Sequence, residues 1–358
     1  MTRERLLAVL DADVDPLLGR GWIAAGALQS ATIGGARAQV RLELGFPAAG
    51  VRQSLATRLR EVILHATGLD ADVQIGWRIG SHAVQKNLQA LPGIRNIIAV
   101  ASGKGGVGKS TVAVNLALGL QAEGARVGIL DADIYGPSQP TMLGMARERP
   151  TSPDGKRMHP ILAHGLQAMS IGFLVDDDQP MIWRGPMVTQ ALAQLLNETA
   201  WEDLDYLIVD LPPGTGDIQL SLSQRIPVSG AIIVTTPQDI ALLDARKGLQ
   251  MFRKVGVPVL GVVENMAWHL CTNCGHREAI FGEQGGAKMA AQYGTELLGQ
   301  LPLDIRIREQ ADSGRPTVVA DPEGELALRY REIARLAAAR LAYGVAADAF
   351  PEISISDD

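Results

Sequence analysis

One short segment constrains the fold of this chain more than any other, because it matches the phosphate-binding pattern G-x-x-x-x-G-K-[ST] at every fixed position. It consists of Gly103, Lys104, Gly105, Gly106, Val107, Gly108, Lys109 and Ser110, and Thr111 follows it. A β-branched apolar run precedes the segment at residues 97–101, and a helical pattern follows it over residues 111–123. A phosphate loop needs a strand before it and a helix after it, so this segment predicts an α/β fold.

The residue types in this loop suit a nucleoside triphosphate. Glycines let backbone N–H groups turn toward phosphate oxygens without Cβ clashes, and the helix N-terminus adds partial positive charge. We expect Lys109 to reach the β and γ phosphates of ATP, and the Ser110 hydroxyl to bind Mg²⁺. The alternative, a chance glycine-rich turn, is disfavoured by the strand and the helix on its two sides.

Apolar strands alternate with helical patterns after the loop. The expected strands are residues 97–101, 127–130, 206–209, 231–235 and 259–263. Short β-branched runs are typical of strands that are buried on both faces. The alternation predicts a doubly wound, mostly parallel sheet, which binds ligands at the carboxyl ends of its strands.

A smaller unit is expected before this sheet. Residues 3–10 and 51–67 favour helices, and residues 38–44 and 71–79 alternate like half-buried strands. We therefore expect a small α+β domain over residues 1–80, a linker over 81–95, a P-loop NTPase domain over 96–345 and an acidic tail over 346–358.

Aspartates follow two of the expected strands. Asp131 and Asp133 close the second strand, and Asp210 closes the third and leads into Pro-Pro-Gly-Thr-Gly. A carboxylate at such a place can hold the hydration shell of Mg²⁺, and Asp210 is our choice for that role. Asp131 is a second candidate. The alternative for any one of these residues is a helix N-cap.

The two cysteines of the chain, Cys271 and Cys274, lie close together in the sequence. Two such thiolates can bind one metal ion or one edge of a cluster. Zinc needs four ligands, for which His269 and His276 are the remaining candidates. An iron–sulfur cluster needs four thiolates, which two chains together supply. A redox dithiol and a pair of inert thiols are further alternatives, and spacing alone does not decide among them.

Composition bears on partners and location. A net charge of −6 gives no reason to expect a nucleic-acid partner. No apolar run is long enough to span a membrane, and the first residues, Met-Thr-Arg-Glu-Arg, lack a signal-peptide pattern. We therefore expect a cytoplasmic protein that has no membrane partner.

Several motifs carry a family resemblance. Lys104 within Lys-Gly-Gly-Val-Gly-Lys-Ser resembles the deviant Walker A pattern of the MinD/ParA/nitrogenase-iron-protein class. As an ordered set, the motifs are similar to those of the Mrp (ApbC) family of iron–sulfur cluster carrier ATPases. The matching stretches are residues 91–93, 130–138, 183–187, 210–217, 236–239, 264–266, 271–276, 281–282 and 314–316.

The resemblance implies roles for the nucleotide site. The chain is expected to be an ATPase that forms a homodimer, in which Lys104 contacts the nucleotide of the partner subunit. Asp133 is expected to position the attacking water, and the Gly214 N–H to sense the γ-phosphate. Asn265 resembles the adenine-contacting position of the class.

The same resemblance implies a cargo. Cys271 and Cys274 of both subunits are expected to bind one [4Fe–4S] cluster, which passes from scaffold proteins to apo iron–sulfur proteins under the control of ATP. The N-terminal unit resembles the small MIP18-type (DUF59) domain through Asp15-Pro16, but has Phe46-Pro47 where many such domains have Cys-Pro. It is expected to be a docking or regulatory module, with a structural appendage as the alternative.

Two other functions remain open at this stage. A zinc-stabilised ATPase is one. A ParA- or MinD-like positioning ATPase is the other, since residues 326–341 are amphipathic and carry several arginines: Arg329, Arg331, Arg335 and Arg340. Because an acidic end follows this segment, we expect it to pack against the protein core rather than on a membrane.

Overall fold

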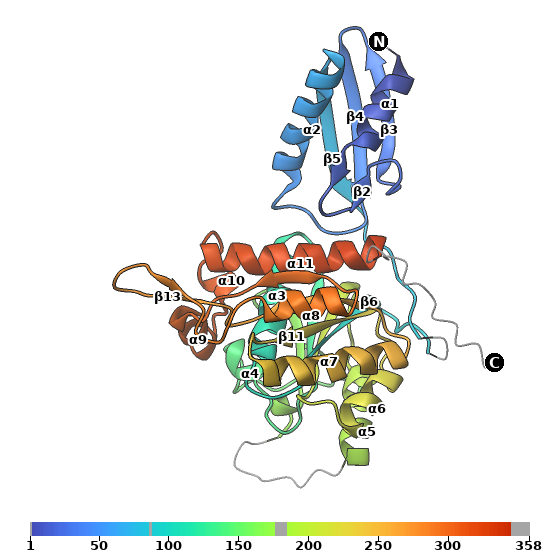
Figure 1. Ribbon diagram of the computed structural model, residues 1–358. Helices are drawn as coiled ribbons and strands as arrows, with labels where there is room; N and C mark the ends of the chain where they lie inside the picture. Colours follow the sequence, from blue (N-terminus) through green and yellow to red (C-terminus); the bar gives the residue numbers. More distant parts are fainter. Residues whose placement is uncertain (1, 86–87, 176–184, 345–358) are drawn as a thin grey trace, which may run out of the picture.

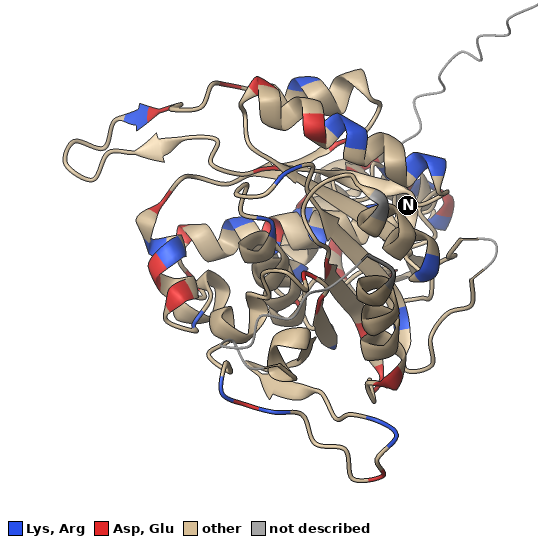
Figure 2. Ribbon diagram, turned by 90° about the horizontal axis from the view of Figure 1, so that it is seen from below, with Lys and Arg blue, Asp and Glu red and all other residues tan. Residues whose placement is uncertain are grey.

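A computed structural model describes residues 2–85, 88–175 and 185–344. The expected acidic tail and residues 183–184 of one matching stretch therefore lie outside the described residues. Figure 1 shows a small N-terminal unit above a larger α/β body, with helix α11 (Glu325–Tyr343) between them. Residues with positive and negative charges are interspersed over the ribbon in Figure 2.

The body is built on a sheet that has eight strands within the described residues. Their order is β15 (Leu297–Gln300), β12 (Val259–Glu264), β11 (Gly230–Thr235), β6 (Ile94–Ala101), β10 (Leu204–Asp210), β7 (Val127–Asp131), β9 (Leu166–Ser170) and β8 (Ile161–Ala163). All neighbours pair in parallel except β8 with β9. The five predicted strands are present, so the doubly wound, mostly parallel fold is confirmed.

Helices cover both faces of this sheet, as burial of every residue of β10, β11 and β12 requires. They are α3 (Lys109–Ala122), α4 (Gln139–Met142), α5 (Gly185–Glu198), α6 (Asp217–Arg225), α7 (Asp239–Lys254), α8 (Gly285–Gln292), α9 (Ile305–Asp312), α10 (Thr317–Ala320) and α11. Residues 112–120 of α3 are all buried, because this helix lies between the sheet and α11.

The N-terminal unit has its own sheet and core. Strands β3 (Leu28–Gly34) and β4 (Arg37–Leu44) are antiparallel, and β5 (Asp70–Trp77) runs parallel to β4. Helices α1 (Arg3–Ala12) and α2 (Arg52–Thr67) pack on this sheet, and two-residue strands β1 (Val14–Asp15) and β2 (Arg20–Gly21) pair nearby. The buried side chains of the two helices are Leu6, Leu10, Leu59 and Ile63.

Helix α11 joins the two units. The Arg340 side chain donates to the Leu17 carbonyl at 2.7 Å, and the Tyr343 hydroxyl accepts from the Gly45 N–H at 2.9 Å. Phe46, which occupies the position expected for cysteine in the small domain, is buried with its ring edge-on to Tyr343 at 6.1 Å. This residue is therefore a packing residue of the interface.

The buried Glu123 receives donors from both units. Its carboxylate accepts from the Gly50 N–H at 2.8 Å and from Arg331 and Arg335 at 2.9 and 2.8 Å. Two of the four arginines of the amphipathic segment thus face inward, and the apolar face of α11 packs against α3. The expectation that this segment packs against the core is confirmed.

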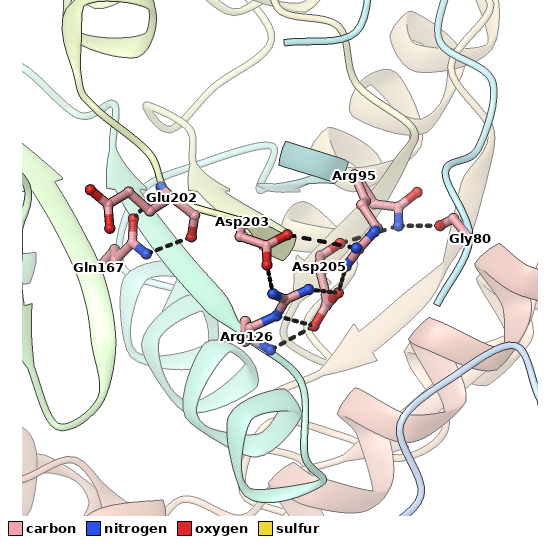
Figure 3. A network of polar contacts seen from close by, with 8 residues as sticks. Gly80, Arg95, Arg126, Gln167, Glu202, Asp203 and Asp205 are labelled. Carbon is pink, nitrogen blue, oxygen red and sulfur yellow. Dashed lines mark hydrogen bonds and ion pairs between the residues drawn. The ribbon is translucent and has the colours of Figure 1, made fainter. Parts of the chain in front are cut away.

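A polar network fixes the amino ends of three central strands (Figure 3). Arg95 on β6 and Arg126 before β7 both pair with Asp205 on β10, and Arg126 Nη2 lies 3.1 Å from the Asp205 carboxylate. Burial opposes ionisation of Asp205, but the hydrogen bonds and charges of Arg126 and Arg95 lower its pKa. This end of the sheet is closed by ion pairs, and the predicted site residues lie at the other end.

Candidate nucleotide site and cysteine hairpin

The phosphate loop has the backbone shape that its glycines allow. Gly106 and Gly108 have φ values of 79° and 82°, in the left-handed region that favours glycine. A Cβ built on Gly105 or Gly106 would meet no heavy atom within 4 Å. The side of the loop next to these two glycines is therefore open, as the predicted binding of phosphate requires.

The other two glycines of the loop are needed for packing. A Cβ on Gly103 would lie 2.2 Å from the Asp244 carbonyl carbon in α7, and one on Gly108 would lie 2.2 Å from Asn265 Nδ2. Asn265 Nδ2 also donates to the Val107 carbonyl at 2.9 Å. The residue predicted to contact adenine thus holds the phosphate loop from the end of β12, and its contact with a base stays a prediction.

Lys109 and Asp210 meet at the start of α3. The Lys109 ammonium forms an ion pair with Asp210 and lies 3.1 Å from Ser110 Oγ. Both charged side chains are buried. Three residues that were predicted to bind the nucleotide and Mg²⁺ therefore lie together: Asp210 and Ser110 both contact the Lys109 ammonium.

Gln139 belongs to the same cluster and was missed by the sequence analysis. Its side-chain nitrogen donates to Asp210 Oδ2 at 2.9 Å and to the Ser110 carbonyl at 3.1 Å. Only its position soon after the strand end of Asp131 pointed to the site, because a lone glutamine matches no phosphate or metal motif.

Asp131 is held by the backbone of the loop that follows it. Its two oxygens accept from the N–H groups of Asp133, Ser138 and Gln139 at 3.0–3.1 Å and from the Ser170 hydroxyl at 3.2 Å. Burial, together with the charge of Asp210, raises the pKa of Asp131 to about 7. One oxygen, Oδ2, accepts from the N–H groups at the start of α4, whose N-cap is Ser138, and Oδ1 accepts from Asp133, so the chain itself engages both oxygens of Asp131.

Asp133 has a different setting, although it is two residues away. The side chain is half-buried, and burial raises its pKa, with Lys109 lowering it and Asp210 raising it. The charges of the ion pair therefore act on this carboxyl group. Its predicted role with the attacking water stays a prediction.

The predicted γ-phosphate sensor contacts the residue that directly precedes the phosphate loop. The Gly214 N–H donates to the Ser102 carbonyl at 3.0 Å, with Gly214 at φ 104°. It must leave this carbonyl before it can reach a phosphate oxygen. In the described part of the chain, the Lys104 ammonium has no hydrogen bond or ion pair, and its cross-subunit contact stays a prediction.

The cysteines occupy a hairpin that extends from the body near α9, seen from two directions in Figures 1 and 2. Strand β13 (His269–Leu270) pairs antiparallel with β14 (Arg277–Glu278). The Cys271 N–H donates to the His276 carbonyl and the Gly275 N–H to the Cys271 carbonyl, each at 2.9 Å. Cys274 is exposed and Cys271 half-buried, so the pair is open to a second molecule.

The turn favours a thiolate at Cys271. Hydrogen bonds from the N–H groups of Cys274 and Asn273 and from the Cys274 thiol lower the pKa of Cys271. Within the described residues, no three or more His, Cys, Asp and Glu side chains gather where they could hold a metal ion. His269 instead faces the Leu303 carbonyl at 3.0 Å. The described residues therefore contain no preformed zinc site made by both cysteines and both histidines of one chain.

A tryptophan at the base orients this hairpin. The Arg277 guanidinium lies 4.1 Å from the Trp268 ring centroid, and the Arg329 guanidinium of α11 lies 5.1 Å from it. Trp268 itself is buried. These cation–π contacts attach the hairpin to α11. Arg329 is thus a third arginine of the amphipathic segment that is used within the chain.

Comparisons with known proteins agree with this arrangement. The family described as ParA, NUBPL iron-transfer P-loop NTPase, matches residues 93–338. The chain is 57% identical over 307 residues to the iron–sulfur cluster carrier protein of Escherichia coli K12, covering 84% of this chain and 82% of that one. It is 46% identical over 338 residues to the protein of the same name from Deinococcus radiodurans, covering 94% and 95%.

Solved structures show the same body. A nucleotide-binding protein from Archaeoglobus fulgidus, in complex with ADP, superposes with a TM-score of 0.57 at 38% identity and covers 65% of this chain and 90% of its own. The cell division ATPase MinD of Pyrococcus furiosus has a TM-score of 0.50 at 22% identity. It covers 67% of this chain and 97% of its own, and so supports the fold alone.

Among the described helices, none has both the length and the apolar character needed to cross a bilayer.

Proposed function

The chain belongs to the NUBPL-type iron-transfer P-loop NTPases of the ParA family, and we propose that it is an ATP-dependent iron–sulfur cluster carrier. The observation that carries the proposal is that one polypeptide has both a phosphate loop and a hairpin whose two thiols are half-buried and exposed. Two relatives that are about half identical to this chain over most of its length are named iron–sulfur cluster carrier protein. The proposed reaction is ATP hydrolysis coupled to cluster loading or delivery.

The residues around Lys109 suit Mg-ATP. Open space beside Gly105 and Gly106 accepts phosphates, and Ser110 and Asp210 both lie at the Lys109 ammonium, where a metal ion can replace that cation. Mg²⁺, when bound, would neutralise negative charge on the β and γ phosphates. Lys109 would move from Asp210 to these phosphates, Asp210 would accept from the hydration shell of the ion, and Asp133 would orient the attacking water.

The thiol count leads to a dimer. A [4Fe–4S] cluster takes four thiolates, whereas one chain has two cysteines. We propose that Cys271 and Cys274 of two subunits bind one cluster between them, with Lys104 of each subunit reaching the nucleotide of the other. A cluster at exposed hairpins would remain accessible to apo-proteins that receive it and to scaffold proteins that supply it.

Two contacts provide a physical route between nucleotide and hairpin. The Gly214 N–H would exchange the Ser102 carbonyl for a phosphate oxygen. Asn265, which donates to the Val107 carbonyl of the phosphate loop, lies at the end of β12 and leads into the hairpin that starts at His269. Movement of the loop would therefore act on the chain segment that carries the cysteines.

Anaerobic reconstitution with iron and sulfide tests the proposal. We expect about four irons for two chains, a dimeric mass, and loss of both in Cys271→Ala/Cys274→Ala. Lys109→Ala should keep the cluster but lose ATP binding. Iron bound equally well by the double cysteine variant, or a strictly monomeric iron-loaded protein, would contradict the cluster site.

The positioning-ATPase alternative has no comparable support. It relied on the amphipathic segment of α11, whose apolar face packs on α3. Its arginines are also engaged within the chain: Arg329 with Glu325, Arg331 and Arg335 with Glu123, and Arg340 with Glu296.

A further inference from the structure

We propose that Gln139 is a positioning residue of the magnesium site, with one end of its amide holding Asp210 and the other accepting a hydrogen bond from metal-bound water. The inference rests on the proposed Mg-ATP site, and it adds a residue that no phosphate or metal motif contains. Carboxylates that bind a metal ion or its waters are commonly fixed by a neighbouring hydrogen-bond donor, which tunes their affinity.

The orientation of the Gln139 amide follows from its partners. The Ser110 carbonyl and the Asp210 carboxylate can only accept hydrogen bonds, so the amide nitrogen must face them, at 3.1 and 2.9 Å. The amide oxygen then has to lie on the other side of the same carbon.

The amide oxygen lacks a donor. Gln139 is 1% exposed, and its Oε1 is buried without a hydrogen-bond partner among the described residues. A buried acceptor that stays unpaired destabilises the fold, so such atoms usually meet a ligand or an ordered water. The amide nitrogen on the same carbon contacts the Asp210 carboxylate and the Ser110 main-chain carbonyl, so this oxygen lies close to the two residues that are proposed to hold Mg²⁺. A water of the ion's hydration shell is the donor that fits this oxygen.

The backbone of Gln139 is fixed as firmly as its side chain. Its N–H donates to Asp131 Oδ2 at 3.0 Å, and it begins the short helix α4. Asp131 also accepts from Ser138 at 3.0 Å, so the start of this helix is attached to the end of β7. The buried Asp131 therefore acts on the metal site through Gln139, and the amide needs little reordering when the ion binds.

Metal affinity tests the proposal directly. Mn²⁺ binding to the full-length protein saturated with ADP is measured by electron paramagnetic resonance, and ADP affinity is measured separately in EDTA. Gln139→Met keeps the volume and removes both hydrogen-bonding atoms. We expect Mn²⁺ affinity to fall about 10- to 100-fold with metal-free ADP affinity unchanged. Gln167→Met, at the opposite end of the sheet (Figure 3), should match the wild type in both measurements.

The outcomes separate the inference from the proposed function. If wild-type protein with ADP binds no Mn²⁺, the proposed Mg-nucleotide site itself fails. If the wild type binds it and Gln139→Met binds it within twofold, the role of Gln139 is refuted. Should Gln139→Met fold poorly, Gln139→Leu serves instead: adding Mn²⁺ to the ADP-bound protein should raise its Tm less than that of the wild type, because both hydrogen-bonding atoms of the amide are absent. An equal rise in both proteins would overturn the proposal.

Discussion

The ammonium of Lys109 and the carboxylate of Asp210 form an ion pair that is buried at the carboxyl end of β10. Each group compensates the other in a region from which water is excluded. In the proposed function, phosphates would replace Asp210 as the partner of Lys109, and the waters of Mg²⁺ would replace Lys109 as the partner of Asp210. Binding of Mg-ATP would then require this ion pair to separate.

Removing one partner of this pair should be costly for stability. In Lys109→Met the Asp210 carboxylate keeps Gln139 but loses its cation, and we expect unfolding free energy to fall by about 3–5 kcal/mol. Lys109→Met/Asp210→Leu should regain part of that loss. Urea denaturation measures both, and Lys247→Met, which breaks an exposed pair with Asp244, is the matched control with an expected change below about 1 kcal/mol.

Two glycines of the loop should respond differently to alanine. Gly108→Ala places a Cβ 2.2 Å from Asn265 Nδ2 at a φ of 82°, so we expect a loss of about 1–3 kcal/mol of stability. Gly105→Ala places its Cβ in open space and should leave thermal stability unchanged. The phosphate site predicts that Gly105→Ala nevertheless weakens ATP binding. Equal melting temperatures for the two variants would contradict this geometry.

Asp131 should make stability depend on pH. Its pKa is about 7 in the folded chain against an ordinary value of 3.8, so between these values the folded state binds more protons than the unfolded state. Unfolding free energy should therefore fall as pH rises from about 4 to 7 and then level off. Asp131→Asn should flatten this profile in urea denaturation series at several pH values. An unchanged slope in the variant would show that another group titrates.

Cys271 should react as a thiolate at lower pH than an ordinary cysteine. Its pKa is lowered by N–H groups of the turn, which exist only in the folded hairpin. In Cys274→Ser, whose hydroxyl preserves the side-chain hydrogen bond, the alkylation rate with iodoacetamide should reach half its maximum at lower pH than in the same variant unfolded in urea. Identical midpoints would mean that the turn does not stabilise the thiolate.

The strands that could be predicted from the sequence are those whose residue composition matches their burial in the sheet. Strands β6, β10, β11 and β12 contain β-branched runs because both of their faces are buried. Strand β9 reads Leu-Gln-Ala-Met-Ser and β15 reads Leu-Leu-Gly-Gln, so neither has that composition, and both were missed. Their strand conformation comes from pairing with β7 and β12 rather than from intrinsic preference.

The candidate site divides in the same way. The loop and Asp210 could be predicted because their proposed chemistry depends on residue type and spacing along the chain. The contacts of Gln139 and Asp131 depend on which donors the fold brings near each carboxylate, and short sequence patterns do not contain that information. That the amide oxygen of Gln139 is buried without a hydrogen-bond donor in the described part of the chain can be seen only in the folded structure, where its neighbours are defined.

Helix α3 has one further consequence. Its first residue is Lys109, and Glu123, which directly follows its last turn, holds the Gly50 N–H of the N-terminal unit. Fourteen helical residues span about 21 Å, so this one helix connects the phosphate loop to the N-terminal unit. A nucleotide that shifts α3 along its axis would also move the Glu123 carboxylate, which accepts from the Gly50 N–H. The position of the N-terminal unit would then depend on the state of the nucleotide site.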